Sequence, residues 1–447
     1  GEDRKADADT HLATARSQNT GTGIFGYQQK IKGSLRWLPL FYLYAGGLMI
    51  AFYLSPVYIL VNIYIIRWMI RWMGTCSHLF QKIWTQVSVV VLYTFFASAI
   101  LVGFLLPEGK ARRIMKLIGN YWLGVMLYVV LTVVVVDLGR ILLRHCKWVN
   151  QGILRAERTF VVTGAICIVI IMAVSIWGVV HAGRIHTTKY EVTVDKDAGK
   201  VENLHIVLAA DLHLGYNVGC YQMKKMVDKI NRQEPDLVVI AGDIFDNEYE
   251  ALDNPDRLAS ILRGIKSKYG VYACYGNHDI QEKILAGFTF GNKNEKKVSD
   301  VRMDEFLEDA NIRLLQDEYV LIDDSFYLYG RPDAKKPGRG IDIRKTPKEI
   351  MEKLDSRKPV IVLDHEPSEL KELSEAGVDI DLCGHTHDGQ MFPGNLVTKL
   401  FWENSCGYLK KGEMHNIVTS GIGLFGPNMR VGTKAEICSV KVHFGSI

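Results

Sequence analysis

The sequence predicts an N-terminal α-helical transmembrane bundle followed by a C-terminal α/β (α+β) sandwich whose helices lie outside the sheets. Residues 37–182 are dominated by Leu, Val, Ile, Tyr and Trp, and seven of the eight tryptophans lie in the first 182 residues. From residue 190 onward, short apolar segments alternate with amphipathic helical patterns. The change in composition predicts a polar, disordered segment over 1–36, a transmembrane domain over 37–183 and a folded domain over 190–447.

The transmembrane domain is expected to contain about four helices. A helix needs about 20 apolar residues to cross a hydrocarbon core of roughly 30 Å. The first segment is interrupted by Gly46, Gly47 and Pro56, and we interpret it as one long kinked helix rather than a pair. The four expected helices cover 38–66, 88–106, 118–143 and 159–182.

The charge pattern bears on membrane orientation and on partners. An even number of spans puts both chain ends on the same side, and basic residues are nearly balanced between the two sides. The short loop between the third and fourth spans is the most densely basic, which by a small margin favours an extracytoplasmic C-terminal domain. A formal net charge of +4 does not argue for a nucleic-acid partner. The eight cysteines lack the CxxC spacing of a zinc knuckle and indicate no disulfide framework.

In the C-terminal part, apolar runs predict strands and spaced apolar residues predict helices. The expected helices include 221–232 and 257–267. The expected strands are 204–210, 236–242, 271–275, 326–331, 359–364, 379–384, 415–420 and 435–444.

Polar residues end five of these strands, and in α/β sheets ligands bind beyond the carboxyl ends of strands. They are Asp211 and His213, Asp243 and Asp246, Asn277, His278 and Asp279, Asp364 and His365, and His385 and His387. Carboxylate, amide oxygen and imidazole together suit Mn, Zn or Fe better than Ca or Mg. A carboxylate such as Asp243 can bridge two cations about 3.5–4 Å apart. Gly242, Gly276 and Gly384 are expected to let the backbone turn sharply after the strands.

The ordered blocks DLH, GDIFD, GNHD, DHEP and GHTH resemble the calcineurin-like metallophosphoesterase superfamily. With "EPDLVVIAGD", "GHTHDGQMFP" and "GPNMRVGTKAEI", the pattern resembles a narrower group, the multi-spanning transmembrane protein with metallophosphoesterase domain and its YkuE-like relatives. The resemblance covers about residues 190–445, and the membrane half matches in layout only. It implies a metallophosphoesterase sandwich of two mixed sheets with helices outside them.

The resemblance also implies roles for individual residues. One metal would be held by Asp211, His213, Asp243 and His387, and the second by Asp243, Asn277, His365 and His385. His278 would contact the phosphate and protonate the leaving group, with Asp279 orienting its ring. The implied function is a dinuclear-metal-dependent phosphoester hydrolase in which a metal-activated hydroxide attacks phosphorus. A phosphodiester is favoured slightly over a phosphomonoester.

Several alternatives stay open. Asp246 could act beside the metals or cap a turn. Arg430 could contact substrate phosphate or serve surface structure. Asp388, where the group usually has a small residue, could bind a metal, repel an anion or face solvent, and we favour the last. Asp137 lies inside the third predicted span and needs a partner, for which Arg140 is a candidate.

The substrate and the class of function are also open. Four spans exceed what anchoring requires, so the substrate is expected to be lipid-linked or membrane-proximal. The segment 282–297 could be a lid or a membrane-touching loop. A non-catalytic membrane protein that uses a metal-bound fold for binding or scaffolding is the alternative. It is disfavoured because all seven ligand positions and His278 are intact.

Overall fold

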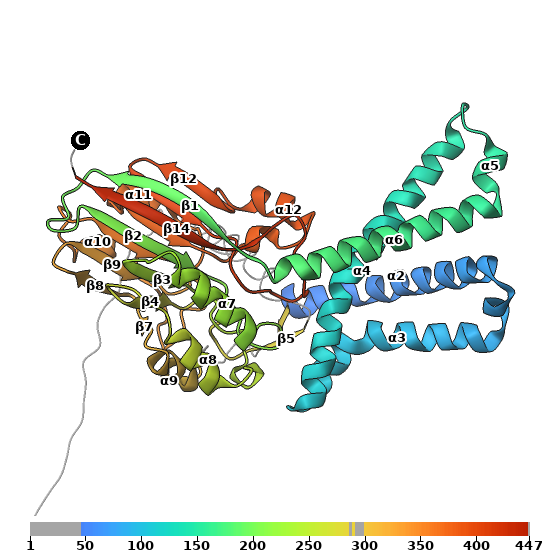
Figure 1. Ribbon diagram of the computed structural model, residues 1–447, viewed down its shortest axis with the longest axis horizontal. Helices are drawn as coiled ribbons and strands as arrows, with labels where there is room; N and C mark the ends of the chain where they lie inside the picture. The colour runs from blue at the N-terminus through green and yellow to red at the C-terminus, as the bar shows by residue number, and fades with distance from the viewer. Residues whose placement is uncertain (1–45, 286–287, 291–298, 446–447) are drawn as a thin grey trace, which may run out of the picture. The chain divides into compact units, whose positions relative to one another are not determined.

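The computed structural model describes residues 46–285, 288–290 and 299–445 (Figure 1). The described residues from Ser55 onward belong to one compact unit. The predicted disordered segment 1–36 and the start of the first predicted span lie outside the described residues, as do 286–287 and 291–297 of the possible lid at 282–297.

The N-terminal part is helical, as expected. Three helices among the described residues are long and apolar enough to cross a membrane: α3, α4 and α6. Helix α2 is continuous through Pro56, in keeping with the single long helix predicted there, but the count of four spans stays a prediction because 38–45 are not described. The elements are α2 (Gly46–Cys76), η1 (His78–Gln81), α3 (Ile83–Leu105), α4 (Lys110–His145), α5 (Gln151–Arg155) and α6 (Glu157–Ala182).

Small residues and buried polar pairs hold these helices together. A Cβ on Gly119 of α4 would lie 2.8 Å from the Cα of Ile100 in α3, so only glycine permits this close backbone approach. The hydroxyl of Tyr93 in α3 donates to Oδ1 of Asn62 in α2 at 2.8 Å. Interhelical hydrogen bonds of this kind satisfy polar groups that would otherwise face hydrocarbon.

The partner of Asp137 differs from the one expected. Its carboxylate accepts a hydrogen bond from the hydroxyl of Tyr64 in α2. The guanidinium of Arg140 instead lies over the ring of Phe160, 5.9 Å from its centroid. Tyr64, on a different helix, is thus the partner of Asp137, although Arg140 is closer in the sequence.

Helix α4 is long and apolar enough to cross a membrane, and its first half also packs on the C-terminal domain. Asn120 donates from Nδ2 to Oδ1 of Asn217 at 2.9 Å, and the Tyr128 hydroxyl donates to the Phe392 carbonyl at 3.2 Å. Met429 fills the space beside Gly124. The predicted span 118–143 therefore includes residues that contact the folded domain.

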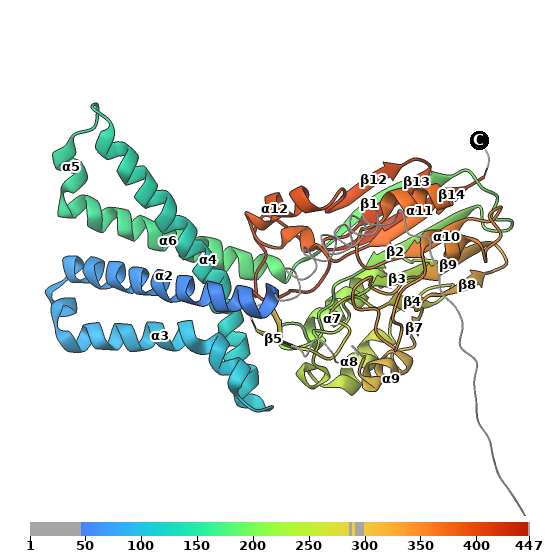
Figure 2. The same ribbon diagram turned by 180° about the vertical axis from the view of Figure 1, so that it is seen from behind.

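The C-terminal domain contains two six-stranded mixed sheets and a small hairpin (Figures 1 and 2). The first sheet has the order β1 (Ile185–Val194), β14 (Ala435–Phe444), β2 (Asn203–Ala209), β3 (Leu237–Ala241), β4 (Val271–Cys274), β7 (Arg313–Leu314). The second has the order β12 (Gly407–Lys411), β13 (Met414–Val418), β11 (Ile380–Cys383), β10 (Val360–Leu363), β9 (Phe326–Gly330), β8 (Glu318–Ile322). The hairpin pairs β5 (Lys283–Leu285) with β6 (Phe288–Phe290).

Alternate residues of each strand serve different layers. Leu208 of β2 packs with Leu363 of β10 in the core between the sheets. Val207 faces the other way, onto α7 and α8, and Val362 of β10 faces α10 and α11. The remaining elements are α7 (Cys220–Asn231), η2 (Tyr249–Ala251), α8 (Pro255–Leu262), α9 (Val301–Asp309), α10 (Pro347–Met351), α11 (Leu370–Ala376), η3 (His387–Gly389) and α12 (Gly394–Phe401).

This architecture confirms the predicted fold class, a two-sheet sandwich with helices outside the sheets. The eight predicted strands are all present. Strands β1, β5, β6, β7, β8 and β12 escaped prediction. Strand β12, for example, alternates between exposed and half-buried residues, so it lacks the continuous apolar run of a central strand.

Candidate metal centre

The seven predicted ligands come together at one edge of the sandwich. Strands β2, β3 and β4 are parallel neighbours in one sheet, and β10 and β11 are parallel neighbours in the other. The carboxyl ends of these five strands therefore meet at a common edge, and each leads into a loop that carries predicted ligands.

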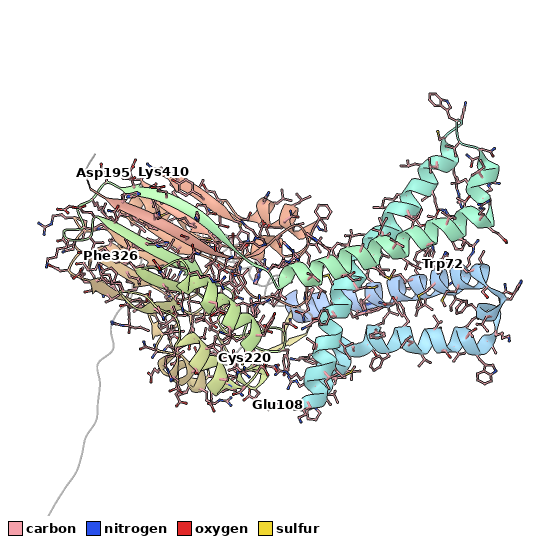
Figure 3. All side chains as sticks on the ribbon, viewed as in Figure 1. Trp72, Glu108, Asp195, Cys220, Phe326 and Lys410 are labelled. Atoms are coloured by element: carbon pink, nitrogen blue, oxygen red, sulfur yellow. The ribbon has the colours of Figure 1, made fainter. Side chains whose placement is uncertain are left out.

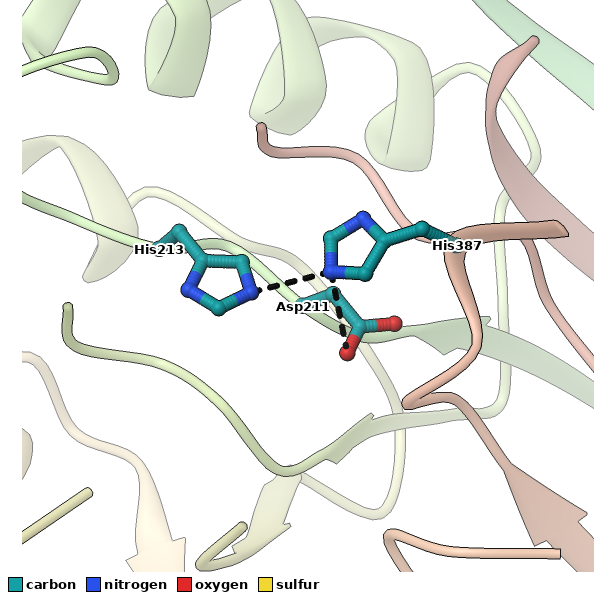
Figure 4. A group of neighbouring side chains, drawn as sticks. All are labelled: Asp211, His213 and His387. Atoms are coloured by element: carbon teal, nitrogen blue, oxygen red, sulfur yellow. Dashed lines mark hydrogen bonds and ion pairs between the residues drawn. The ribbon is translucent and has the colours of Figure 1, made fainter. Parts of the chain in front are cut away.

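Three of these residues form a first donor set, Asp211, His213 and His387 (Figure 4). The Nε2 atoms of His213 and His387 lie 3.0 Å apart, and Asp211 Oδ1 lies 3.8 Å from His387 Nε2. All three residues are buried. Burial and the neighbouring His213 ring hold the pKa of His387 well below its usual range, so its ring is neutral and can offer a lone pair.

A second donor set contains Asp243, Asn277, His365 and His385. His365 Nε2 lies 3.1 Å from Asn277 Oδ1, 3.1 Å from His385 Nδ1 and 3.2 Å from Asp243 Oδ2. His385 Nδ1 lies 3.0 Å from the same Asn277 oxygen. Burial and the nearby His365 lower the pKa of His385 to about 3, so this ring also stays neutral.

Asp243 lies between the two sets. Its Oδ2 is 3.2 Å from His365 Nε2 and 3.7 Å from His213 Nε2, so one carboxylate faces both groups of donors. Burial opposes its ionisation, but the imidazoles of His365, His278 and His213 outweigh burial and hold its pKa well below the usual range. Asp243 is therefore a buried anion placed to bridge two cations.

The donors fit divalent metal ions. Two ring nitrogens bound to one cation at about 2.0–2.1 Å would lie roughly 3 Å apart, which matches the 3.0 Å and 3.1 Å pairs. Within the described residues, no Lys or Arg forms an ion pair with Asp211 or Asp243. Two buried carboxylates without a cationic side chain are expensive unless a cation binds them.

The backbone at the site is held in a sparsely populated conformation. Five of the seven predicted ligands have positive φ, a state that costs a non-glycine residue about 1 kcal/mol or more. They are Asp211 (53°), His213 (45°), Asp243 (49°), His385 (75°) and His387 (51°). Such strain persists only where the surrounding structure enforces it, so it marks this edge as a functional region.

The glycines act in two different ways. Gly242 has φ 73° and turns the chain before Asp243, as predicted. Gly276 also begins a turn, in which the Asp279 N–H donates to the Gly276 carbonyl at 3.3 Å, but its φ is not positive. A Cβ there would lie 2.3 Å from Asp243 Oδ1 and 2.8 Å from His365 Cδ2, so glycine is needed for close packing against the donors.

The residue that holds His278 is not the one expected. Asn247 Oδ1 contacts the ring at Nδ1, while Asn247 Nδ2 donates to the Ile280 carbonyl at 3.0 Å. Asp279 instead accepts backbone hydrogen bonds from Phe245 at 2.8 Å and Gly276 at 2.7 Å. Asp279 thus braces two ligand-bearing loops, and nothing in the sequence distinguished it from Asn247 as the ring's partner.

Two further carboxylates lie beside the donors. Asp246 Oδ1 is 3.6 Å from His213 Nδ1 and 3.9 Å from His278 Nδ1, which favours a role at the site over the capping alternative. Glu366 Oε1 is 3.6 Å from His385 Nε2, a contact that sequence reasoning missed although Glu366 follows His365 directly. Burial raises the pKa of Glu366.

Three other residues singled out in the sequence have different surroundings. Arg430 is fully buried, and its Nη2 donates to the carbonyls of Ser420 at 2.8 Å and Gly423 at 2.9 Å. These bonds leave it badly placed for substrate phosphate. Asp388 is half-buried and belongs to none of the donor clusters found among the described residues. Asp364 is paired with Arg331 at 2.6 Å.

Comparison with known proteins agrees with this geometry. A sequence model of the calcineurin-like phosphoesterase family matches residues 204–389. A protein of Danio rerio named transmembrane protein with metallophosphoesterase domain is 28% identical over 290 residues, covering 62% of this chain and 61% of the relative. A metallophosphoesterase of Campylobacter jejuni is 31% identical over 243 residues, covering 53% of this chain and 58% of the relative.

The metallophosphoesterase YkuE of Bacillus subtilis is 26% identical over 269 residues, covering 57% of this chain and 84% of the relative. The match spans less than two thirds of the transmembrane relatives, so their whole-protein properties do not transfer with it. The part that does match contains all seven predicted ligands. Residues 204–389 therefore match the calcineurin-like phosphoesterase family, in a chain that also contains three helices long and apolar enough to cross a membrane among its described residues.

Proposed function

We propose that this chain is a membrane-anchored phosphoester hydrolase that depends on two divalent metal ions. The observation that carries the proposal is the position of Asp243, a buried anion facing two sets of imidazole, amide and carboxylate donors. One ion would be held by Asp211, His213, Asp243 and His387, and the other by Asp243, Asn277, His365 and His385. Mn, Zn and Fe are the candidates that this donor chemistry favours.

Metal ions bound at these donors would supply charge neutralisation for the phosphate and a lowered pKa for water. His278 is placed to move a proton. Because Asn247 Nδ2 is committed to the Ile280 carbonyl, the Asn247 oxygen faces His278 and accepts the hydrogen of Nδ1. Burial lowers the pKa of His278 to about 4, so the ring is neutral and Nε2 is left with a free lone pair. Nε2 must therefore take up a proton before it can pass one to a leaving-group oxygen.

The substrate we propose is a lipid-linked or membrane-proximal phosphate ester, with a diester favoured over a monoester. Support comes from the direct packing of α4 on the site loops. Arg112 donates to both carboxylate oxygens of Glu248 at 2.8 and 2.9 Å, and Lys116 donates to one of them at 3.0 Å. Glu248 follows Asn247, so the helix reaches within one residue of the group that holds His278.

The basic loop between the third and fourth predicted spans supports an extracytoplasmic domain. Labelling of single engineered cysteines in intact cells, one in that loop and one at Lys410, would test this orientation. Modification at Lys410 by a membrane-impermeant reagent is the expected result. Modification in the basic loop alone would reverse the orientation.

The second candidate function is a non-catalytic metal-bound scaffold. The intact His278–Asn247 pair favours the enzyme, because metal binding alone requires no ring held for proton exchange. The purified full chain would be assayed for bound metal and for turnover of bis-p-nitrophenyl phosphate and p-nitrophenyl phosphate with Mn, Zn or Fe. Turnover that His278→Ala abolishes while metal content is kept supports the hydrolase. Bound metal without turnover of either ester or of a phosphate-ester lipid would favour the scaffold.

Matched controls separate the site from general effects of substitution. Asp355→Ala removes a carboxylate paired only with Arg357 on the surface, and His443→Ala removes an exposed histidine of β14. Both variants are expected to keep metal content and turnover. The ester that is cleaved faster then decides between diester and monoester.

A further inference from the structure

Helix α12 displays an apolar face that no other part of the described chain covers. Leu396 and Val397 are 53% and 47% exposed, and Leu400 and Phe401 are 81% and 78% exposed. Folded domains seldom leave a contiguous group of large apolar side chains in water, and such groups mark contact surfaces. The polar residues of the helix include Lys399.

The four residues share one side of the helix. Positions 396 and 400, and 397 and 401, are each four apart, and side chains at this spacing lie one above the other on a helix. The result is a short amphipathic helix in which none of the eight residues is buried. It has the form of an element that lies in an interface rather than in a core.

The beginning of α12 is attached to helices that can cross a membrane. Met391 is 5% exposed and packs in a cluster with Tyr128 of α4 and Met429, against which Val174 and Val179 of α6 also pack. The Tyr128 hydroxyl donates to the carbonyl of Phe392 at 3.2 Å. Figures 1 and 2 both show α12 beside the C-terminal end of α6, and Figure 3 draws the side chains on the ribbon in the view of Figure 1.

The two ends of α12 meet the metal centre. Helix α12 packs on η3, the turn that contains His387. Trp402 follows the helix, and its ring lies 5.2 Å from the ring of His385, edge to face. Helix α12 is therefore connected through Met391 and Phe392 to the membrane-capable helices, and through η3 and Trp402 to residues of both donor sets.

We propose that α12 is an interfacial helix that inserts Leu396, Val397, Leu400 and Phe401 into the lipid leaflet nearest the domain. Lipid is the occupant because the patch continues from helices that themselves lie in lipid. Lys399 can reach headgroup phosphates while its stem covers apolar surface. The inserted helix holds the donor edge at headgroup level, where a phosphate ester carried by a lipid meets it. This last point rests on the proposed function.

Photo-crosslinking in the full chain tests the insertion without requiring activity. p-Benzoylphenylalanine replaces Leu400, Phe401 or, as a control, Leu321, and each chain is reconstituted in phosphatidylcholine–phosphatidylglycerol vesicles. Leu321 is 37% exposed and pairs with Tyr327 near the beginning of β9. The donor edge lies at the other end of the sheet, where β9 ends at Gly330. Lipid adducts at 400 and 401, at least about fivefold above those at 321, are expected. Equal adducts at all three positions, or adducts with another protein chain, overturn the proposal.

A second measurement asks whether the helix serves a lipid substrate. The double variant Leu400→Glu with Phe401→Glu should lower turnover of a phosphate-ester lipid in vesicles by about tenfold or more, because charges replace two apolar side chains that would insert into lipid. Turnover of a water-soluble ester should fall by less than about twofold, and Leu321→Glu should change neither. An equal fall for both esters overturns the role in lipid presentation. If the wild-type chain cleaves neither ester, the proposed function fails, while crosslinking still decides whether α12 inserts.

Discussion

Two buried charge clusters lie at neighbouring strand ends, and their partners differ. Asp364 ends β10 and is fully buried, with Arg331 at 2.6 Å and Arg344 at 3.2 Å. Asp211, after β2, is equally buried but receives only the His385 backbone N–H and faces imidazoles. Burial raises the pKa of Asp211 to about 6.

The comparison separates a structural charge from a ligand. Glu369 completes the Asp364 network by accepting from both arginines at 2.6 Å, so its charges offset one another within the protein. In the metal centre, by contrast, carboxylate oxygens and ring nitrogens of several residues lie close together in two groups, each able to bind one cation. The network around Asp364 therefore needs no metal cation, because its arginines balance its carboxylates. The donors of the metal centre do need one.

The largest expected effect is loss of activity in Asp243→Ala. This change removes the carboxylate shared by both donor sets, so turnover should fall by at least about 10³-fold, with loss of bound metal. Metal analysis and steady-state assays on the purified chain would measure both. As a control, Asp364→Asn changes a comparably buried carboxylate and should keep bound metal in the folded protein. Retention of both metals by Asp243→Ala would contradict the proposal that Asp243 binds both ions.

The next effect concerns stability. Asp364→Ala leaves Arg331 and Arg344 without their central anion, and breaking a buried pair in this way should lower the free energy of unfolding by about 3 kcal/mol. Chemical denaturation in detergent, followed by a probe in the domain, measures this change. Asp355→Ala on the surface should cost less than about 0.5 kcal/mol. A near-zero effect of Asp364→Ala would contradict the claim that Asp364 stabilises the fold through its two arginines.

The pH dependence of stability distinguishes a buried carboxyl paired with arginine, such as Asp364, from a buried carboxyl without such a partner among the described residues, Asp381. Burial, and then the negative charge of Asp364, raise the pKa of Asp381 to about 7. The folded state therefore keeps its proton when the unfolded state, with a pKa near 4, has lost it. Stability should fall by roughly 3 kcal/mol as pH rises from about 4 to 7, and Asp381→Asn should remove that loss. An Asp381→Asn variant with an unchanged pH profile would contradict this attribution.

The smallest effect tests how His278 is held. Asn247→Ala removes the acceptor at Nδ1 and should lower kcat by about tenfold, with both metals still bound and KM little changed. Asn247→Asp, which keeps an acceptor, should recover part of the rate. Asp279→Asn should instead act on stability, because Asp279 accepts only backbone hydrogen bonds. If Asn247→Ala and Asp279→Asn lowered kcat equally, Asn247 could not be the residue that alone positions the His278 ring.

Short motifs singled out seven residues that the structure brings together at one edge, because a strand end and the residues just beyond it are local in sequence. The same locality explains what was missed. Asn247 and Asp279 are both close to His278 in the motifs, yet only the folded loops bring Asn247 to the ring. Tyr64 reaches Asp137 from another helix, although Arg140 is nearer in sequence. Strand β12 pairs at a sheet edge, where alternating exposure hides it from an apolar pattern.

The sequence by itself determined the types of residue at five strand ends, the apolar segments and the two-sheet fold, because periodicity and motif spacing act over a few residues. Only the tertiary structure decided which buried carboxylates are neutralised by arginine and which face imidazoles. It also decided that α12 leaves its apolar face uncovered beside α6. Charge pairing and burial depend on contacts between residues far apart in the chain, so no local pattern contains them.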